Sequence, residues 1–268
     1  MGIFSGCLLV SDIDGTLYTG GKIPKRNLEM LEYFKSEGGF FSIATGRGPT
    51  AGVEICKNAG VNAPVLLCNG AVVFDTKAFK TLNVTEMPSS AFGVLKAVCE
   101  KFPEVGAEIT YPSCIVTFKE SGYTKEHRAV EGFEYTETAP CGEQPIKGLV
   151  MLKDQERLRE VKAFMQSIKP DDCDYIATSS TFYEILAKGV SKALNLDLLC
   201  SICGADKNSV YCIGDCDNDL EMVKAASVGA FCENAAEHLK KQADYVAAPA
   251  SEGAVADFIN YIKTLRQK

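Results

Sequence analysis

The sequence predicts an α/β fold, in which a Rossmann-like parallel sheet is interrupted by a separate α+β domain. Short apolar segments alternate with amphipathic helical segments in the first part of the chain and again after Gly189. Strands joined by helices favour a parallel sheet with helices on both faces. Between these two parts, longer polar stretches and a succession of strand candidates indicate a different architecture. At 268 residues the chain is long enough for two domains.

The first part alternates strand and helix. Residues 7–11 read as a strand, 24–36 as a helix with Leu28, Leu31 and Phe34 on one face, and 40–44 as a second strand. A second helix over 49–60 and a strand over 64–68 follow. Ligands of such sheets collect at the carboxyl ends of the strands, so the residues after each strand are the candidates for a site.

The same alternation returns near the end of the chain. We expect a helix over 191–203, a strand over 209–213 and a helix over 218–226. Strands over 228–231 and 244–246 and a final helix from about Ala254 complete this part. Both outer parts together would supply one parallel sheet.

The middle of the chain reads as an inserted domain. Its strand candidates are residues 115–118, 149–152, 175–177 and 183–186, and its helices are residues 89–101 and 155–168. We therefore expect one domain built from residues 1–82 and 188–268, and an inserted α+β domain of residues 83–187.

Composition excludes several classes of partner. The net charge of −7, without a basic cluster, argues against nucleic acid. No apolar run approaches the roughly 20 residues that span a bilayer, and no charged and apolar leader opens the chain, so we expect no membrane partner and a cytoplasmic location. A small phosphorylated ligand remains compatible with this charge, because a bound cation reverses the local field.

Cysteine and histidine usage narrows the chemistry further. The twelve cysteines are dispersed in apolar patterns, which indicates reduced thiols in a protein of this size. Cys200 and Cys203 have metal-ligand spacing, but no second such pair accompanies them. Only two histidines are present, so carboxylates are expected to carry the chemistry.

The strongest local signal is the pair Asp12 and Asp14, directly after the first apolar segment. Residues two apart on an extended chain point the same way, so both acids can meet one cation at a strand end. Oxygen ligands suit a hard divalent metal, and one carboxylate could still react. Gly15 allows a tight turn, and Thr16 adds a hydroxyl. The alternative is an acidic turn without function.

Three more polar groups follow predicted elements. Thr45 and Arg47 follow the second strand and can bind a phosphoryl group or a substrate anion. Lys192 opens a predicted helix, where an ammonium and free amides can face an anion. Asp215 and the residues up to Asp219 follow the strand over 209–213 and offer more oxygen ligands. Each has an alternative as a helix cap or a surface charge, but their common placement favours one site.

These motifs resemble those of the haloacid dehalogenase superfamily. The resemblance rests on Asp12-Ile13-Asp14-Gly15-Thr16-Leu17, Thr45-Gly46-Arg47, Gly189-Val190-Ser191-Lys192 and Gly214-Asp215-Cys216-Asp217-Asn218-Asp219. The insertion after Leu67-Cys68-Asn69-Gly70-Ala71 and the segment Glu233-Asn234-Ala235 are similar to the Cof-type, class IIB phosphatases. The family would make the inserted domain a class C2B cap that selects the substrate.

The resemblance implies a Mg²⁺-dependent phosphatase that acts on small phosphorylated metabolites, such as a sugar phosphate or a phosphorylated cofactor, through an aspartyl phosphate. Asp12 would be the nucleophile, and Asp14 the general acid and base. The implied magnesium ligands are Asp12, Asp14 through its backbone carbonyl, Asp215 and Asp219. The phosphate ligands would be Thr45, Lys192 and Asn218, and Arg47 and Asn69 would contact the substrate.

Other activities stay open at this level. A phosphotransferase or phosphomutase would use the same aspartyl phosphate, and a receiver-type signalling domain also combines acids, a threonine and a lysine on a parallel sheet. In the inserted domain, Phe182 and Tyr183 are expected in the core, and His127 and Arg128 on a solvated face. Cys216, inside the last motif, predicts sensitivity to thiol reagents. The physiological substrate and the oligomeric state are left open.

Overall fold

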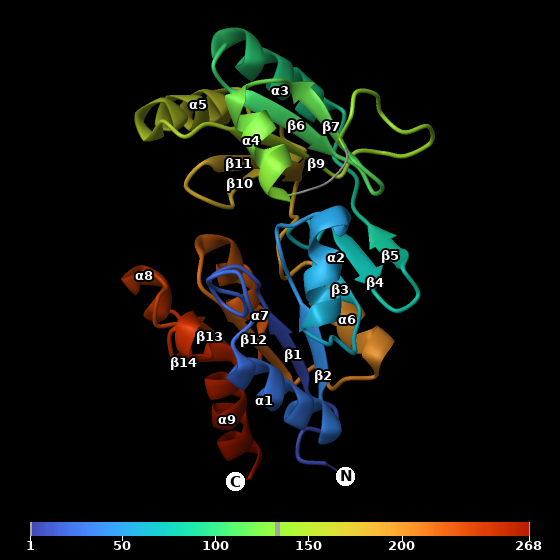
Figure 1. Cartoon of the computed structure of the whole chain (residues 1–268), viewed down its shortest axis with the longest axis vertical. Coiled ribbons are helices and arrows are strands. Elements are labelled where there is room, and N and C mark those ends of the chain that lie inside the picture. The colour runs from blue at the N-terminus through green and yellow to red at the C-terminus, as the bar shows by residue number, and fades with distance from the viewer. Residues whose placement is uncertain (1, 132–134, 268) are drawn as a thin grey trace. The chain divides into compact units, whose positions relative to one another are not determined.

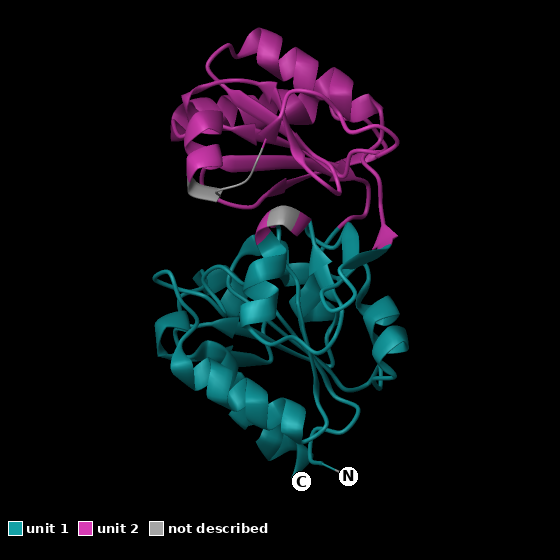
Figure 2. Ribbon diagram, turned by 45° about the vertical axis from the view of Figure 1, so that its right-hand side comes forward, with its two compact units in different colours: residues 1–46, 52–82, 191–268 teal, residues 47–51, 83–190 magenta. Residues whose placement is uncertain are grey.

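The computed structural model describes residues 2–131 and 135–267 and divides the chain into two compact units. The core unit contains Met1–Gly46, Gly52–Leu82 and Ser191–Lys268, and the inserted unit contains Arg47–Ala51 and Asn83–Val190 (Figure 2). Residues 188–190, which the sequence assigned outside the insertion, group with it. The amide of Lys188 donates to the backbone carbonyl of Asp172, and the amide of Gly189 donates to the carboxylate of Asp174. The short piece Arg47–Ala51 was not expected there.

The core unit is built on a five-stranded parallel sheet (Figure 1). Its order is β14-β13-β12-β1-β2, with all neighbours parallel. In the register, Leu8 of β1 lies opposite both Val210 of β12 and Phe40 of β2. The bounds are β1 Leu8–Ser11, β2 Phe40–Ile43, β12 Val210–Gly214, β13 Val228–Cys232 and β14 Tyr245–Ala247. The most central strands therefore end at the two acidic motifs, as the sequence predicts.

Helices cover both faces of this sheet. On one face, Tyr211 of β12 meets Phe258 of α9, and α9 packs beside α1. On the other face, Leu8 and Val10 share a buried cluster with Leu199 of α6 and Met222 of α7. The helices of the core unit are α1 Lys25–Ser36, α6 Leu196–Cys203, α7 Leu220–Ala225, α8 Glu237–Lys240 and α9 Ala254–Arg266, and α2 Pro49–Asn58 begins in the inserted unit.

A three-stranded sheet, in the order β3-β4-β5, follows α2. Strand β3 (Val65–Leu67) continues from β2 through a single parallel bridge between Ala44 and Leu66, and pairs with β4 (Val72–Asp75). The outer strand β5 (Lys80–Val84) is largely exposed, and its apolar residues Leu82 and Val84 are exposed as well, so it carries no buried face of the kind that marks a core strand.

The inserted unit is an α+β layer. Its six strands have the order β10-β11-β9-β6-β7-β8, and α3 (Ser90–Lys101) and α5 (Gln155–Ser167) pack on the sheet. Their shared core contains Leu95, Val150 and Ile185. Each predicted helix and strand of this region is present, although with shifted ends. The bounds are β6 Gly106–Thr110, β7 Ile115–Lys119, β8 Tyr135–Thr136, β9 Lys147–Met151, β10 Cys173–Ala177 and β11 Phe182–Ala187.

Three elements of the inserted unit were not predicted, namely β6, β8 and helix α4 (Gly122–Glu131). The buried side of α4 carries Thr124 and the half-buried Tyr123 and His127, so the helix lacks an apolar stripe. Its start is nevertheless encoded, because the Ser121 hydroxyl accepts hydrogen bonds from the amides of Tyr123 and Thr124.

No helix within the described ranges is long and apolar enough to cross a membrane. All twelve cysteines lie in those ranges and are free thiols.

Candidate functional site

The candidate site lies at the carboxyl ends of the central strands. Asp12 directly follows β1, and its amide still donates to the carbonyl of Ile213 in β12. Asp215 follows β12, and Thr45 follows β2 after one residue. Parallel strands end at the same edge of a sheet, so the core unit brings together residues from both ends of the sequence.

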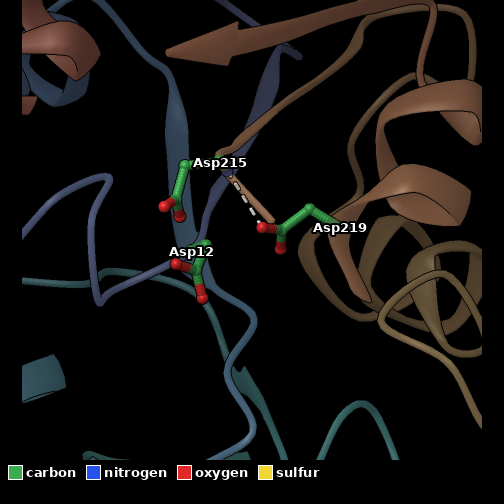
Figure 3. A group of neighbouring side chains, drawn as sticks. All are labelled: Asp12, Asp215 and Asp219. Atoms are coloured by element: carbon green, nitrogen blue, oxygen red, sulfur yellow. Dashed lines mark hydrogen bonds between the residues drawn. The ribbon is translucent and has the colours of Figure 1, made fainter. Parts of the chain in front are cut away.

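Three carboxylates converge at this edge (Figure 3). Asp12, Asp215 and Asp219 each offer one oxygen, and these oxygens lie within 4.8 Å of one another. Asp12 and Asp219 are buried, whereas Asp215 is half-buried. Clusters of this kind are costly to bury unless a cation compensates for the charge.

Lys192 supplies part of that compensation. Its ammonium is 2.6 Å from Oδ1 of Asp12 and 2.6 Å from Oδ1 of Asp219, and its side chain is almost fully buried. The expectation that Lys192 opens a helix is wrong, because residues 192–195 form a turn and α6 begins only at Leu196. The turn is held in place by Asn195, whose side-chain amide donates to the carbonyl of Gly70 at 2.8 Å.

Hydrogen bonds from two backbone amides and one hydroxyl fix the orientation of two of the acids. Oδ2 of Asp219 accepts hydrogen bonds from the amides of Asp215 and Cys216, both at 3.0 Å (dashed for Asp215 in Figure 3). This closure explains why the predicted helix over 218–226 begins with the 3₁₀ turn Asp217–Asp219 before α7. The Thr16 hydroxyl donates to Oδ1 of Asp215 at 3.0 Å.

Two glycines leave room for these carboxylates. A Cβ atom at Gly15, where φ is +87°, would lie 2.3 Å from Oδ2 of Asp215. A Cβ atom at Gly214 would lie 2.3 Å from Cγ of Asp219. Gly15 therefore serves both the left-handed turn that the sequence indicates and the close approach of Asp215.

The charges of the site do not balance without a further cation. Burial raises the pKa of Asp12 to about 8, since lost solvation outweighs the attraction of Lys192 and the Asp219 and Asp215 carboxylates add repulsion. Burial and Asp219 likewise raise the pKa of Asp215 to about 6. Burial alone would lower the pKa of Lys192, but Asp12 and Asp219 outweigh it and raise that pKa. Three carboxylates face one ammonium, so a proton or a metal ion is favoured.

The donor set fits a hard divalent cation. Carboxylate oxygens are the ligands that Mg²⁺ and Ca²⁺ prefer, and Mg²⁺ is usually held by one or two carboxylates with water and substrate phosphate completing the shell. Asp12, Asp215 and Asp219 would hold such an ion. The cluster contains no thiolate or imidazole ligand, which zinc would favour.

The raised pKa of Asp12 predicts how stability depends on pH when metal is removed by a chelator. A folded-state pKa near 8, against about 3.9 in the unfolded chain, means that the folded protein binds this proton more tightly. The Asp12 contribution to the free energy of unfolding should therefore fall as pH rises from about 4 to about 8. Unfolding temperatures of wild type and Asp12→Asn, measured at pH 5 and pH 8, isolate this contribution. An equal change with pH in both proteins would contradict it.

Mg²⁺ should reverse the trend, because it competes with the proton for the same carboxylates. The stabilisation by Mg²⁺ should be larger at pH 8 than at pH 6 in the wild type.

The remaining predicted residues are placed differently. Asp14 is exposed, in the turn closed by the hydrogen bond from the Gly15 amide to the carbonyl of Tyr18. Thr45 and Asn69 are buried, and the amide of Asn69 donates to the carbonyl of Thr45 at 2.8 Å. Asn218 donates to Oδ1 of Asn69 at 3.1 Å, which joins two predicted residues. Arg47 groups with the inserted unit.

Two supporting residues could not be recognised by their local sequence. Asn195 anchors the lysine turn to Gly70, where a Cβ atom would lie 2.2 Å from the carbonyl oxygen of Ser191. Asn234 donates to the carbonyl of Gly15 at 3.0 Å and accepts from the amide of Ala250. Both contacts join segments far apart in the sequence, although Asn234 lies in a segment that the family resemblance singled out.

Cys216 is less reactive than the sequence suggests. Partial burial of its sulfur and the neighbouring Asp215 and Asp219 carboxylates raise the pKa of this thiol to about 12. The thiolate is the nucleophilic form, so Cys216 without bound metal is not an activated cysteine.

Comparison with known proteins gives the context for this geometry. A family model described as haloacid dehalogenase-like hydrolase matches residues 9–259. The 5-amino-6-(5-phospho-D-ribitylamino)uracil phosphatase YitU of Bacillus subtilis is 24% identical over 94% of this chain and 96% of its own length. A phosphoglycolate phosphatase of Methanopyrus kandleri is 25% identical over 94% of this chain and 95% of its own length.

Solved structures agree with the fold. A haloacid dehalogenase-like hydrolase from Bacteroides thetaiotaomicron has a TM-score of 0.82 at 25% identity, covering 96% of this chain and 99% of that one. The subclass IIB sugar phosphatase BT4131 has a TM-score of 0.80 at 23% identity, covering 95% of this chain and 98% of that one.

Proposed function

The chain belongs to the haloacid dehalogenase-like hydrolases, and on this premise we propose that it is a Mg²⁺-dependent phosphatase of small phosphorylated metabolites. The observation that carries the proposal is the convergence of Asp12, Asp215 and Asp219 around one buried lysine. This arrangement would hold a divalent cation, and it leaves Asp12 at the carboxyl end of β1 as the reacting carboxylate.

Asp12 attacks the phosphorus atom of the substrate. A bond forms between a carboxylate oxygen and phosphorus, and the bond between phosphorus and the leaving oxygen breaks, which produces an aspartyl phosphate. Lys192 engages Oδ1 of Asp12 and so orients the carboxylate. The other oxygen, Oδ2, would then be the atom that attacks phosphorus.

Asp14 is the proposed general acid and general base. Its exposed position, two residues after Asp12, suits a group that gives its proton to the departing alkoxide. It then takes a proton from the water that attacks the phosphorus atom. Hydrolysis regenerates the Asp12 carboxylate and releases inorganic phosphate.

Lys192, Thr45 and Asn218 are the proposed phosphoryl ligands. The ammonium compensates negative charge, and the hydroxyl and amide donate hydrogen bonds to the equatorial oxygens. Asn69 supports Asn218 through their hydrogen bond, and Arg47 would meet the organic part of the substrate. When bound, Mg²⁺ supplies further charge neutralisation and fixes the phosphoryl group for in-line transfer.

The relatives support a small substrate. YitU is named for a phosphorylated ribitylaminouracil, and the Methanopyrus protein for phosphoglycolate. For this chain we therefore propose a small phosphorylated metabolite, such as a sugar phosphate or a phosphorylated cofactor.

A panel of phosphorylated metabolites tests the proposal, with released inorganic phosphate as the readout. Phosphate release should require Mg²⁺ and stop in excess EDTA. Excess Ca²⁺ should inhibit, because it accepts more ligands and can draw Asp12 into bidentate coordination. Full activity in EDTA would contradict the role assigned to the acidic cluster.

The same panel separates hydrolysis from transfer. Turnover is measured with and without an added alcohol acceptor, and a phosphatase should release the same amount of phosphate in both. A new phosphorylated alcohol formed at the expense of phosphate would assign a phosphotransferase instead.

A further inference from the structure

The inserted unit contains a pocket of its own. The pocket has a volume of about 200 Å³, and every residue that lines it belongs to this unit. It lies between α4 and the ends of β9 and β11. Its wall is formed by Tyr123, His127, Met151, Leu152, Thr181 and Phe182, together with the ion pair of Glu126 and Lys153. The volume is below the roughly 300 to 1,000 Å³ of pockets that enclose drug-sized ligands, so it suits a single ring.

Three of the side chains that line the pocket are aromatic, those of Tyr123, His127 and Phe182. The rings of His127 and Phe182 meet edge to face, with their centroids 5.1 Å apart. Phe182 was expected in the core but is half-buried, because it lies on the sheet face opposite the α3 and α5 core. Met151 is its direct partner in the register of β9 and β11. Rings and a thioether make favourable contacts with a flat aromatic group.

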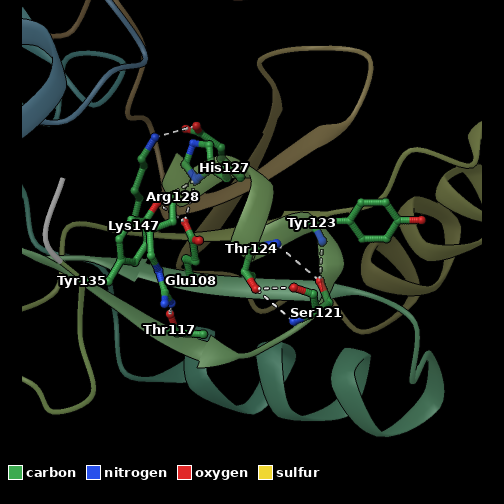
Figure 4. Close-up of polar contacts among 10 residues, drawn as sticks. Glu108, Thr117, Ser121, Tyr123, Thr124, His127, Arg128, Tyr135 and Lys147 are labelled. Atoms are coloured by element: carbon green, nitrogen blue, oxygen red, sulfur yellow. Dashed lines mark hydrogen bonds and ion pairs between the residues drawn. The ribbon is translucent and has the colours of Figure 1, made fainter. Parts of the chain in front are cut away.

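Hydrogen bonds fix the imidazole of His127, which lines the pocket (Figure 4). Nδ1 of His127 is 2.9 Å from Oε2 of Glu108 and 2.9 Å from the hydroxyl of Tyr135. Since the carboxylate accepts, Nδ1 carries the hydrogen, and Nε2 has no hydrogen-bond partner among the residues the structure describes. His127 was expected on a solvated face, and its side chain is instead 13% exposed.

Two buried polar atoms near His127 have no hydrogen-bond partner among the described residues. Glu108 is buried, and its Oε1 has no partner within the described part of the chain. Arg128, also expected to be solvated, donates to Thr117 and stacks on Tyr135, while its buried Nε lacks a partner among the described residues. Buried polar groups are normally satisfied, so exceptions point to a missing ligand or water.

A charged row lies beside the aromatic wall on the same sheet face. In the register, Leu149 of β9 lies between Glu108 of β6 and Glu184 of β11. Lys147 is 2.6 Å from Glu184, and both are buried. The next row along contains Met151 and Phe182. On this face of the sheet, the apolar side chains of Met151 and Phe182 therefore lie next to a row that contains the hydrogen-bonding groups of Glu108 and Glu184.

We propose that this pocket binds a planar heterocyclic ring, and that the polar row binds the hydroxyl or amide groups attached to it. The site lies within the inserted unit and does not depend on the proposed function. The ligand class is a compound with one planar heterocyclic ring and attached hydroxyl or amide groups, such as a nucleoside.

Two substitutions in the full-length protein test the site. Phe182→Ala removes one aromatic side chain from the wall, so the affinity for a planar ring should fall by roughly 10- to 100-fold, the usual effect of removing one stacking partner. Phe118→Ala changes an exposed phenylalanine on β7 and is the matched control, which should keep the wild-type affinity.

Binding tests the pocket without any turnover. Uridine, which carries one planar ring and no phosphate, is titrated into the wild type and the variants and followed by ligand-observed NMR. Binding should be retained in Phe118→Ala and weakened in Phe182→Ala, and Phe182→Leu serves if the alanine variant does not fold. His127→Phe, which keeps a ring but removes Nε2, should also weaken it.

The outcomes are separable. No binding of uridine to the wild type, or equal binding in Phe182→Ala or Phe182→Leu, overturns the inference. Binding that depends on Phe182 in a protein that releases no phosphate from any substrate would refute the proposed function and leave the ring site standing.

Discussion

Asp12→Asn should abolish phosphate release from every substrate while the protein remains folded. An amide does not attack phosphorus and is a poor ligand for a hard cation, so both roles proposed for this residue are lost. The substitution is nearly isosteric, and it removes a charge from a cluster in which burial raises the pKa of Asp12. The metal-free variant should therefore be at least as stable as the wild type at pH 8. Steady-state phosphate release and thermal unfolding measure the two effects.

Asp14→Asn is the matched control. Its carboxylate lies two residues along the same turn but is exposed, so the change should cost roughly 10² to 10⁴ in rate. It should leave the stabilisation by Mg²⁺ intact. Near-normal turnover in Asp12→Asn would show that another group is the nucleophile.

Lys192→Ala should lower both activity and stability. The ammonium lies 2.6 Å from Asp12 and from Asp219, and its removal leaves these two buried carboxylates without their cation. Breaking a buried ion pair by removing one partner typically costs about 3–5 kcal/mol. Activity should fall for all substrates alike, since the phosphoryl group is common to them. Chemical denaturation and kcat/KM over the substrate panel check both results.

The stability loss in Lys192→Ala should shrink at low pH and in Mg²⁺. Protonation or metal binding neutralises Asp12 and Asp219, which have lost their lysine partner in the variant. The stability of the variant should therefore increase more than that of the wild type in either condition. Lys207→Ala, at an exposed pair with Asp197, is the control and should change stability by less than about 1 kcal/mol. A loss in Lys192→Ala as small as in this control would contradict the charge balance described for the site.

The carboxylates of the site could be predicted from the sequence because strand ends are encoded locally. An apolar segment followed by acids places Asp12 and Asp215 at an edge of a parallel sheet, whatever the rest of the fold does. The position of Lys192 could not be predicted in the same way. Its burial depends on a turn held by Asn195 and Gly70, a contact between distant segments that no periodicity reports.

The polar pocket of the inserted unit was missed for a related reason. Sequence periodicity detects helices by their apolar stripe, and α4 instead buries Thr124 and half-buries His127. The charge of His127 and Arg128 suggested solvent, whereas Glu108 and Thr117 bind them from strands that precede α4. The cap signal at Ser121 was the local feature that could have revealed the helix.

The order of strands in the core sheet also bears on how the protein is made. Leu8 of β1 pairs with Val210 of β12, so β1, which leads to Asp12, lacks one neighbour until most of the chain has left the ribosome. The buried cluster of the inserted unit, by contrast, draws on residues between Met87 and Ile185 alone. During synthesis the inserted unit can therefore complete its core first. Until β12 is synthesised, β1 and β2 form a sheet whose apolar β1 edge is unpaired.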